Sequence, residues 1–264
     1  MSTEEDLYLR ANQPAANTAW LLAQFCLALA LADAIAGIFA GIGYRLDLWD
    51  YRDGIGALQY VFWLAAGTAV VAAIAATVGI ATNRPGAIFV GSLALVIAGI
   101  TAYVPWSLRQ IIRSVPPIHD ITTDTDNPPQ FVRITGTRRK TDHPLSYDGP
   151  EVAALQKKGY PDIGPIVVNA PAEKVFEASK QVLTAMGLEV IDAEPIQGRL
   201  EATDRSLLFG FEDDVVLRIV PGADGTTKVD VRSKSRVGRS DLGINAGRIR
   251  EFGAALRRKL PAGN

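Results

Sequence analysis

Hydrophobic residues are concentrated in the first 106 positions, where they form three long runs. The runs extend from Thr18 to about Tyr44, from about Leu58 to Thr82, and from about Ala87 to Trp106. At 1.5 Å of rise per residue, each is long enough for a helix to cross a hydrocarbon core of about 30 Å. The alternative is three buried helices of a soluble all-α domain, which we disfavour because the runs are nearly free of charge and apolar on all faces. We therefore predict three transmembrane helices within residues 18–106.

The connections between the runs agree with this prediction. Only residues 83–86, Asn-Arg-Pro-Gly, separate the second run from the third, so these two must form an antiparallel hairpin. Residues 1–17 are polar and lack the pattern of a secretory signal peptide, and we expect a disordered or interfacial tail. Aromatic residues typical of membrane interfaces cluster near the predicted ends: Trp20, Tyr44, Trp49, Tyr51, Tyr60, Trp63, Tyr103 and Trp106.

Asp33 is the single charge inside the first run. An ionisable residue at membrane depth is expensive and is by default a candidate for function. The predicted spans contain no Lys, Arg or His to act as its partner in a proton relay. The structural alternative is a hydrogen bond to Gln24, to Thr68 or to a backbone carbonyl of a neighbouring helix, and we favour it. Gly37 and Gly41 follow as a GxxxG pair, which permits close helix approach.

Residues 107–162 separate the membrane part from the rest of the chain. Pro116-Pro117 and Pro128-Pro129 bracket a run rich in Thr and Asp, which predicts a turn-forming linker over 107–131. The same carboxylates resemble a calcium-type cluster, but the spacing lacks the glycine and terminal Glu of an EF-hand, and we predict no metal site. From Val132 to Pro161 we expect an irregular segment that contains the basic triplet Arg138-Arg139-Lys140.

From residue 163 onward, short apolar patterns alternate with turn signals and predict a small α+β domain over 163–264. The expected order is β-α-β-β-β-β-α, which an antiparallel sheet with two helices packed on one face satisfies. About 100 residues is enough for such a domain to have its own core. The predicted strands cover 166–168, 188–193, 199–203, 211–220 and 226–235, and the helices follow Pro171 and the polar turn at 237–241.

The stretch from Val229 to Leu260 carries the densest group of polar side chains. A strand pattern, a polar turn and a helical pattern follow one another there, and Ser240 and Asp241 are good N-cap residues. A helix N-terminus and nearby arginines suit a phosphate or carboxylate. The alternative is structural, with Asp241 capping the helix and pairing with Arg236 or Arg248. The candidate ligand-binding residues are Arg232, Ser235, Arg236, Arg239, Ser240, Asp241, Asn245 and Arg248.

Charge is balanced overall but divided within this domain. The 264 residues have a net charge of −1. Residues 186–224 hold nine acids against three Arg, whereas residues 225–260 hold ten Lys or Arg against three acids. These halves either pair with each other across a solvated surface or leave a basic face toward anionic lipid. With one cysteine and two histidines, the chain offers no intrachain disulfide, zinc cluster or Cys/His dyad, and we predict no cofactor.

The C-terminal part resembles a known family. The strings VRSKSRVGRSDLGINAGRI and LLFGFEDDVVLRIVP, with IHDITTDTDNPPQF upstream, look like the DUF1499 family of uncharacterised bacterial and plastid proteins, over roughly Pro116 to Leu260. Members are commonly lipoproteins or lumenal proteins, which implies a periplasmic C-terminal domain on a bacterial inner-membrane anchor. The count of arginines in the short loops favours the opposite topology by a few charges, and we follow the resemblance. The family has no established activity, so the resemblance implies no mechanism.

The sequence is compatible with three functions. The first is a membrane-tethered, non-catalytic binding or assembly module of the cell envelope, with the lipid bilayer and an anionic lipid or small anion as partners. The second is an envelope hydrolase, although no GxSxG elbow or phosphate-binding glycine loop is present. It would draw its base from Asp213, Asp214 or Asp241 and its nucleophile or positioning hydroxyl from Ser233, Ser235 or Ser240.

The third is an accessory subunit of a larger complex, with a membrane protein as partner and Asp33 at the interface. Nucleic acid is not expected as a partner, because basic residues interleaved with aromatic ones, the pattern of a nucleic-acid platform, do not occur. Of the three, we favour the non-catalytic module.

Overall fold

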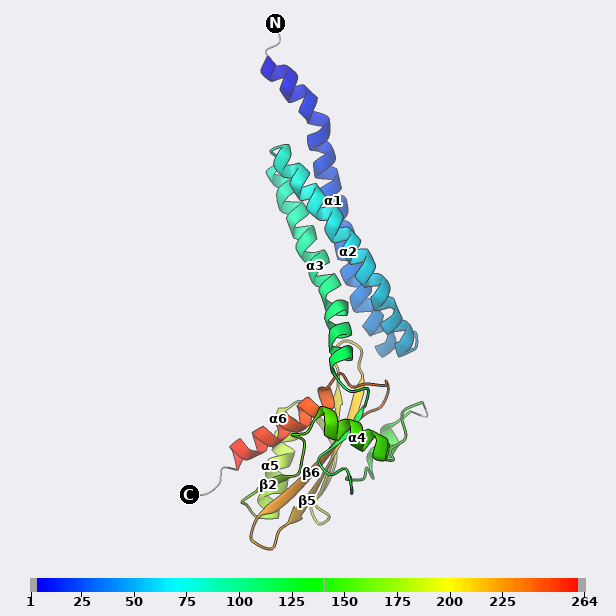
Figure 1. The fold of residues 1–264 in the computed structure, drawn as a ribbon, viewed down its shortest axis with the longest axis vertical. Helices are drawn as coiled ribbons and strands as arrows, with labels where there is room; N and C mark the ends of the chain where they lie inside the picture. The colour runs from blue at the N-terminus through cyan, green and yellow to red at the C-terminus, as the bar shows by residue number, and fades with distance from the viewer. Residues whose placement is uncertain (1–3, 140, 261–264) are drawn as a thin grey trace. The chain divides into compact units, whose positions relative to one another are not determined.

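The computed structural model describes residues 4–139 and 141–260 (Figure 1). The chain divides into two compact units. The first comprises the N-terminal part up to Gln110 together with Leu208–Gly210, and the second comprises the remainder. Each unit has its own packing and is described by itself.

Three long helices make up nearly all of the first unit: α1 (Glu4–Arg45), α2 (Tyr51–Ala81) and α3 (Pro85–Ser114). All three are long and apolar enough to cross a membrane, which confirms the three predicted membrane helices by length and composition. Two boundaries differ from expectation. The polar segment expected to be a tail is helical from Glu4, and α3 continues past Trp106 to Ser114.

Small residues form the contacts between the three helices. The buried cluster consists mainly of alanines from all three, and Cys26 lies within it. A Cβ added to Gly91 of α3 would stand 3.0 Å from the backbone nitrogen of Ala76 in α2, and one added to Gly79 would stand 3.0 Å from that of Ile88. Large apolar side chains such as Phe89 and Ile100 point outward instead. This is the division of side chains that helices surrounded by lipid require.

The second unit contains a six-stranded antiparallel sheet. The strand order is β1-β6-β5-β4-β3, and β2 also pairs with β6. The strands are β1 (Asp120–Thr122), β2 (Ile166–Val168), β3 (Glu189–Glu194), β4 (Arg199–Arg205), β5 (Glu212–Pro221) and β6 (Thr227–Ser235).

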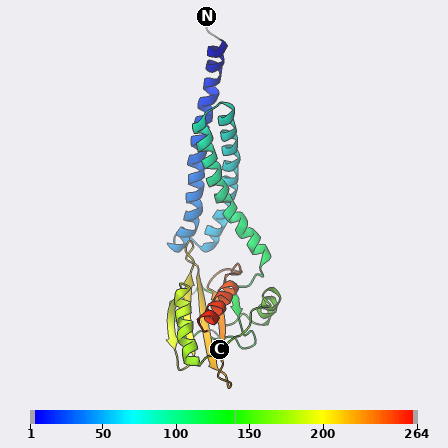
Figure 2. The same cartoon turned by 90° about the vertical axis from the view of Figure 1, so that its left-hand side faces the viewer.

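Helices α5 (Ala172–Ala185) and α6 (Ile244–Lys259) cover one face of this sheet (Figure 2). The core between them is apolar, with alternate residues of the strands, such as Val215 and Leu217 of β5, packed against helix residues such as Phe176 and Phe252. The predicted α+β class, with an antiparallel sheet and two helices on one face, is therefore confirmed. The intervening residues of the strands point to the opposite face.

That opposite face is covered by the segment between β1 and β2. A second, smaller core joins Val216 of β5 to Phe131 and Ile134. The segment contains a 3-10 helix, η1 (Ile134–Thr137), and a helix, α4 (Pro150–Gly159), where the sequence predicts irregular structure. It begins with β1, which lies in the predicted linker.

Both differences have physical reasons. A three-residue strand shows no alternation of its own, and β1 forms because β6 offers it a free edge. By contrast, α4 carries helix signals in the sequence: Pro150 at its start, Glu151 in the first turn and Lys157 and Lys158 in the last.

The helix packing makes a testable distinction between two glycines of α3. Gly91→Leu should lower the free energy of unfolding of the first unit by about 1–3 kcal/mol, because its side chain would overlap the backbone of α2. Gly99→Leu is the matched control, since nothing lies within 4 Å of a Cβ added there. The measurement is the thermal unfolding midpoint of the full chain in detergent. Equal midpoints for both variants would contradict the close packing.

Candidate functional site

The alternation of β6 places two cations on the sheet face opposite α5 and α6. Val229 and Val231 pack in the core below the helices, so Arg232 and Lys234 point to the other side. Both are 0% exposed. They are covered by the segment between β1 and β2, which we call the covering segment. A buried charge is tolerated only when it is paired and hydrogen-bonded, so the partners of these cations define the site.

Arg232 is held by a carboxylate, by the backbone carbonyls of Pro129 and Leu145, and by two aromatic rings. Its Nε and Nη2 atoms donate to the two oxygens of Asp120 at 2.9 and 2.8 Å, and Nη1 donates to the carbonyl of Pro129 at 3.2 Å. The guanidinium lies 5.0 Å from the ring centre of Phe131 and 5.4 Å from that of Tyr147. A bidentate pair with cation–π contacts fixes this side chain in one orientation.

Lys234 shares the same carboxylate. Its Nζ atom donates to Asp120 at 3.1 Å, to Asp148 at 2.6 Å and to the carbonyl of Ser146 at 2.8 Å. All three ammonium donors are therefore used. Asp120 thus neutralises two buried cations at once and joins β1, β6 and the covering segment.

A second cluster lies where β5 begins and β6 ends. Arg236 donates to Asp214 through Nε at 3.1 Å and Nη2 at 2.8 Å, and to Glu212 through Nη1 at 2.6 Å. Arg138 of the covering segment also binds Asp214. Burial acts to lower the pKa of Arg236, but Asp214 and Glu212 raise it above its usual value. Arg236 therefore stays charged and fully engaged inside the domain.

Glu201 of β4 binds the backbone of the covering segment. Its carboxylate accepts backbone N–H bonds from Val132 at 2.8 Å, Arg133 at 2.9 Å and Ile134 at 2.9 Å. These N–H groups lie at the start of η1, where no backbone partner is available. The sheet face opposite α5 and α6 is therefore closed by ionic and capping bonds.

On the helix face, Asn245 of α6 connects two serines of β6 to Arg248. Asn245 Oδ1 accepts from Ser233 Oγ at 2.6 Å and from Arg248 Nη1 at 2.5 Å, and its amide nitrogen donates to Ser235 Oγ at 3.0 Å. Arg248 also donates to Asp213 at 2.9 Å. The polar residues at the start of α6 therefore bond the helix to the sheet.

The N-cap position of α6 is Gly243 rather than Ser240 or Asp241, but the side chain of Asp241 bonds to the start of the helix, as the structural alternative expects. Its carboxylate accepts from the N–H groups of Asn245 at 2.7 Å and Gly243 at 3.1 Å. Burial raises the pKa of Asp241 above its ordinary value, although these two N–H groups favour the ionised form. Its ion pair with Arg236 or Arg248 does not form, because those arginines bind Asp214 and Asp213 instead.

The structure therefore brings the candidate residues together but encloses most of them. Ser240 is half-buried, with its Oγ accepting from Leu242 N–H at 3.2 Å, and Arg239 is exposed. The ion pairs with β4 and β5 join the basic and acidic halves of the domain within its own fold. Buried side chains are those of Arg232, Ser235, Arg236, Asp241, Asn245 and Arg248.

The groups named for a hydrolase are engaged in the same way. Asp213 and Asp214 pair with arginines, and Ser233 and Ser235 bond to Asn245. Within residues 4–139 and 141–260, the hydroxyl of Ser240 is directed to the carbonyl of Pro116 at 3.5 Å rather than to a base. A nucleophile needs a base within hydrogen-bond reach, which these contacts do not supply.

The two histidines of the chain stack on each other beside Lys234. The ring centres of His119 and His143 are 4.0 Å apart, and His143 Nε2 lies 2.9 Å from the carbonyl of Gly238. His119 Nε2 lies 3.2 Å from Asp148, which favours the charged imidazole. Burial, together with His143 and Lys234, outweighs this carboxylate and lowers the pKa of His119 below its usual value.

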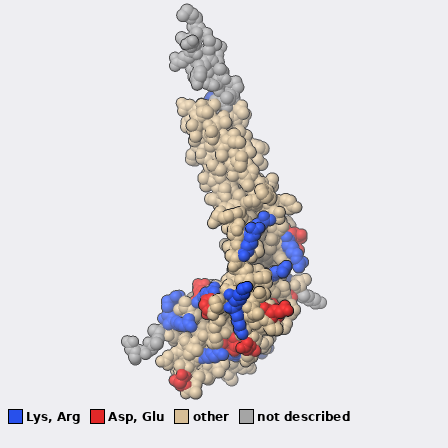
Figure 3. Space-filling view, viewed as in Figure 1, with Lys and Arg blue, Asp and Glu red and all other residues tan. Residues whose placement is uncertain are grey.

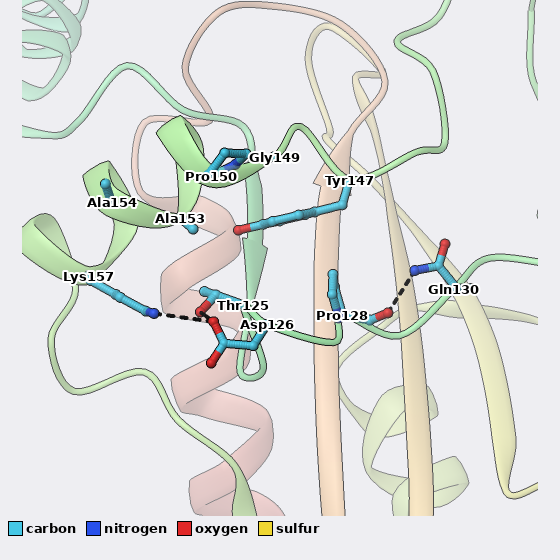
Figure 4. A pocket seen from close by; sticks show the side chains of 10 residues that line it. All are labelled: Thr125, Asp126, Pro128, Gln130, Tyr147, Gly149, Pro150, Ala153, Ala154 and Lys157. Carbon is cyan, nitrogen blue, oxygen red and sulfur yellow. Dashed lines mark hydrogen bonds and ion pairs between the residues drawn. The ribbon is translucent and has the colours of Figure 1, made fainter.

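A pocket of about 500 Å³ opens between α4 and the loop after β1 (Figure 4). Tyr147 crosses its back wall, and burial raises the pKa of this phenol to about 12, so it keeps its proton. The Tyr147 Oη atom is buried without a hydrogen-bond partner in the part of the chain that the structure describes. Lys157 and Asp126 pair across the rim at 3.5 Å. The remaining lining is mainly apolar.

In the first unit, Asp33 has the partner that the sequence offered in α2. Thr68 Oγ1 donates to Asp33 Oδ2 at 2.8 Å, and both side chains are buried. The structural interpretation of Asp33 as an interhelical bond is thereby supported.

The acids that complete the site were not among the sequence-based candidates. Asp120, Asp148 and Glu201 lie far from β6 along the chain or on another strand. One signal was available: the Asp-rich run at 120–126 and the basic β6 have complementary charge. Asp124 of that run likewise pairs with Arg218, at 3.0 Å. These carboxylates therefore bind basic side chains of the same domain.

A family model described as "Protein of unknown function (DUF1499)" matches residues 120–256, just over half of the chain. The chain belongs to the DUF1499 family. Among curated proteins, none matches it. The DUF1499 match begins at Asp120 and ends inside α6, so it includes both the buried cations and the covering segment. The first strand, β1, is accordingly a part of the DUF1499 domain.

Two aspartates of the same run should differ sharply in their effect on stability. Asp120→Ala removes the carboxylate shared by two buried cations, and breaking such a pair costs about 3–5 kcal/mol. Asp126→Ala removes an exposed ion pair and should change stability by less than about 0.5 kcal/mol. The thermal unfolding midpoint of the full chain in detergent measures both. A stable Asp120→Ala variant would contradict the role assigned to this pair.

The lowered pKa of His119 predicts a loss of stability in mild acid. Because the folded-state pKa lies below the unfolded value of 6.5, His119 contributes stability that is present above pH 6.5. This contribution is lost as the pH falls through the folded-state pKa. The thermal midpoint of the wild type should fall more than that of His119→Gln between pH 7.5 and pH 5.5. Parallel curves for the two proteins would show that His119 titrates as it does in the unfolded chain.

Proposed function

We propose that this DUF1499 protein is a membrane-tethered, non-catalytic binding or assembly module of the cell envelope. The observation that carries the proposal is the internal neutralisation of the polar cluster on β6 and α6. Arg232, Lys234, Arg236 and Arg248 each bind carboxylates of the same domain. Such a cluster stabilises one rigid fold, which is what a domain that presents a surface to a partner needs.

The arrangement of hydroxyls and carboxylates supports a non-catalytic role. A general base must reach the proton that it removes, and a nucleophile must reach its substrate. Ser233, Asp213 and Asp214 are instead held in bonds to Asn245, Arg248 and Arg236. Chemistry at these residues would first require the ion pairs of the core to open.

Recognition of an anion is assigned to Arg239. This side chain is exposed on the turn between β6 and α6, and the backbone of the turn is bonded to the segment that follows α3. Asp241 N–H donates to the carbonyl of Ile118 at 3.1 Å, which holds the turn in place. A guanidinium on a fixed turn suits a phosphate or carboxylate, whether of a lipid headgroup or of a small solute.

The cellular placement is part of the same proposal. The three apolar helices support an integral membrane protein, and a bacterial inner-membrane anchor with a periplasmic domain is what the resemblance to lipoprotein and lumenal DUF1499 members implies. A reporter fused after Asn264 tests the orientation. A periplasmic signal is the expected result, and a cytoplasmic signal would agree with the arginine count of the short loops and overturn this placement.

Anion recognition is tested by comparing two exposed arginines. Inorganic phosphate and a short-chain anionic phospholipid are titrated separately against the full chain in neutral detergent, so that the two sources of phosphate are distinguished. Arg239→Ala should weaken binding about 10- to 100-fold, as expected for about 1.5–3 kcal/mol in one charged hydrogen bond. Arg258→Ala, in the last turn of α6, is the control and should bind like wild type. Equal binding by both variants would refute recognition at the turn.

A further inference from the structure

The stacked histidines lie where the covering segment meets the end of β6. His119 immediately precedes β1, and the rings of His119 and His143 are 4.0 Å apart with an angle of 22° between their planes. The His143 N–H donates to the carbonyl of Arg236 at 2.7 Å, and the Nε2 atom of His143 lies 2.9 Å from the carbonyl of Gly238. The stack therefore fastens the covering segment to the turn that follows β6.

Asp148 connects this stack to the buried cation of Lys234. One oxygen of Asp148 lies 3.2 Å from His119 Nε2, and the other accepts from Lys234 Nζ at 2.6 Å. The His119 nitrogen is buried and makes no hydrogen bond to the rest of residues 4–139 and 141–260, so the carboxylate is close to it without being bonded to it. A proton added to His119 would enter a site whose nearest carboxylate already binds an ammonium group.

The charged groups around His119 come from three elements. The covering segment contributes Asp148, while β1 and β6 contribute Asp120 and Lys234, which bind each other at 3.1 Å. On the side of α6 the contact is uncharged, because the Asn245 amide donates to the backbone carbonyl of His119 at 3.1 Å. The two carboxylates favour a proton on His119, and Lys234 opposes it.

His143 meets two further charged residues through its backbone. Arg138 of the covering segment donates to the His143 carbonyl, and Arg236 accepts from the His143 N–H through its own carbonyl. Both guanidinium groups bind the carboxylate of Asp214. A second charged imidazole beside these groups would face its stacked neighbour at 4.0 Å, and like charges at this distance repel.

These surroundings make the closed stack a poor place for protons. Burial, His143 and Lys234 together outweigh the carboxylates and hold the pKa of His119 below its ordinary value of 6.5. A histidine on a released, solvated segment regains that ordinary value. The open form therefore binds a proton more strongly than the closed form, and its population rises as the pH falls below 6.5.

The contacts on either side of the stack do not involve a histidine. Gln156 of α4 exchanges two hydrogen bonds with the backbone of Thr122, at 3.0 and 2.7 Å, and an amide does not titrate. On the other side, Phe131 packs against Val216 of β5 in the smaller core. Residues 143–148 lie between these two anchors, so this stretch can open while the anchors hold.

We propose that the His119–His143 stack is an acid-sensitive latch, which releases residues 143–148 from β6 in mild acid while the sheet stays folded. This inference does not depend on anion recognition by Arg239, because every group in the latch lies inside the domain.

Opening of the latch changes the surroundings of the two buried cations. Lys234 loses the Ser146 carbonyl and the Asp148 carboxylate and keeps Asp120. Arg232 loses its bond to the carbonyl that precedes Ser146 and likewise keeps Asp120. Acid thereby uncovers a cationic stretch of β6 that is fully enclosed in the closed form.

The test is backbone hydrogen exchange of the full chain in detergent at pH 7.5 and pH 5.5, expressed as protection factors so that the intrinsic effect of pH is removed. The His143 N–H reports the latch, since its bond to Arg236 breaks on release, and the amides of residues 215–219 in β5 report global unfolding. One histidine that titrates near 6.5 only in the open form raises the open population about tenfold at pH 5.5. We therefore expect the protection of His143 to fall by about five- to tenfold between the two pH values.

Two comparisons decide the result. At pH 5.5 the His143 amide should exchange at least about tenfold faster than the β5 amides, as a local opening does. In His119→Phe, which keeps a flat ring in the stack but cannot be protonated, the acid-dependent fall should be lost; His119→Gln takes its place if the Phe variant does not fold. Equal protection of His143 and β5 at pH 5.5 would show global unfolding only, and an unchanged fall in the variant would show that the stack is not the sensor. Either result overturns the proposal.

Discussion

The ion pair between Arg232 and Asp120 is the contact on which the rest of the DUF1499 domain depends. It joins β6 to the edge strand β1, and the two residues are 112 positions apart in the chain. Both partners are fully buried, and removing a buried guanidinium from water is expensive unless its hydrogen bonds are replaced. The covering segment supplies the hydrogen-bond acceptors that offset the cost of burying the Arg232 guanidinium. Arg232 in turn fixes the position of that segment on the sheet. Lys234 and Asp148 extend the same constraint toward α4.

A sheet that carries charge on a covered face favours one arrangement of the chain over others. Each cation of this layer has carboxylates at defined positions, so a shift of register by one residue would separate several pairs at once. Buried polar networks of this kind contribute less to stability than an apolar core, and their attested role is to specify a single structure. Figure 3 shows acidic and basic residues intermixed on the visible face of the second unit, whereas the middle part of the long helices shows no charged residue on this face. The polar face of β6 is thus an internal element of the fold.

Much of this fold could be predicted from periodicity, and most of the charged layer could not. The three apolar runs, the strands β3 to β6 and the helix after Asn169 have patterns long enough to be recognised locally. Strand β1 has three residues, and its formation depends on an edge supplied by β6. The alternation around Arg232 correctly separates two faces, but it cannot say that a distant segment covers the polar one. The bond from Asp241 to the first turn of α6 could be expected because it is a local interaction, although the N-cap position itself is Gly243.

The pairing of β1 with β6 also has a consequence for how the protein is made. Asp120 and Lys234 are 114 residues apart, and β1 follows directly after the last helix of the first unit. The first strand to leave the ribosome after that helix must wait for nearly the whole domain before it finds its partner. Contacts of such high sequence separation are associated with slow folding. The helices can therefore enter the membrane while the domain is still an open chain, and the sheet closes only after β6 has been synthesised.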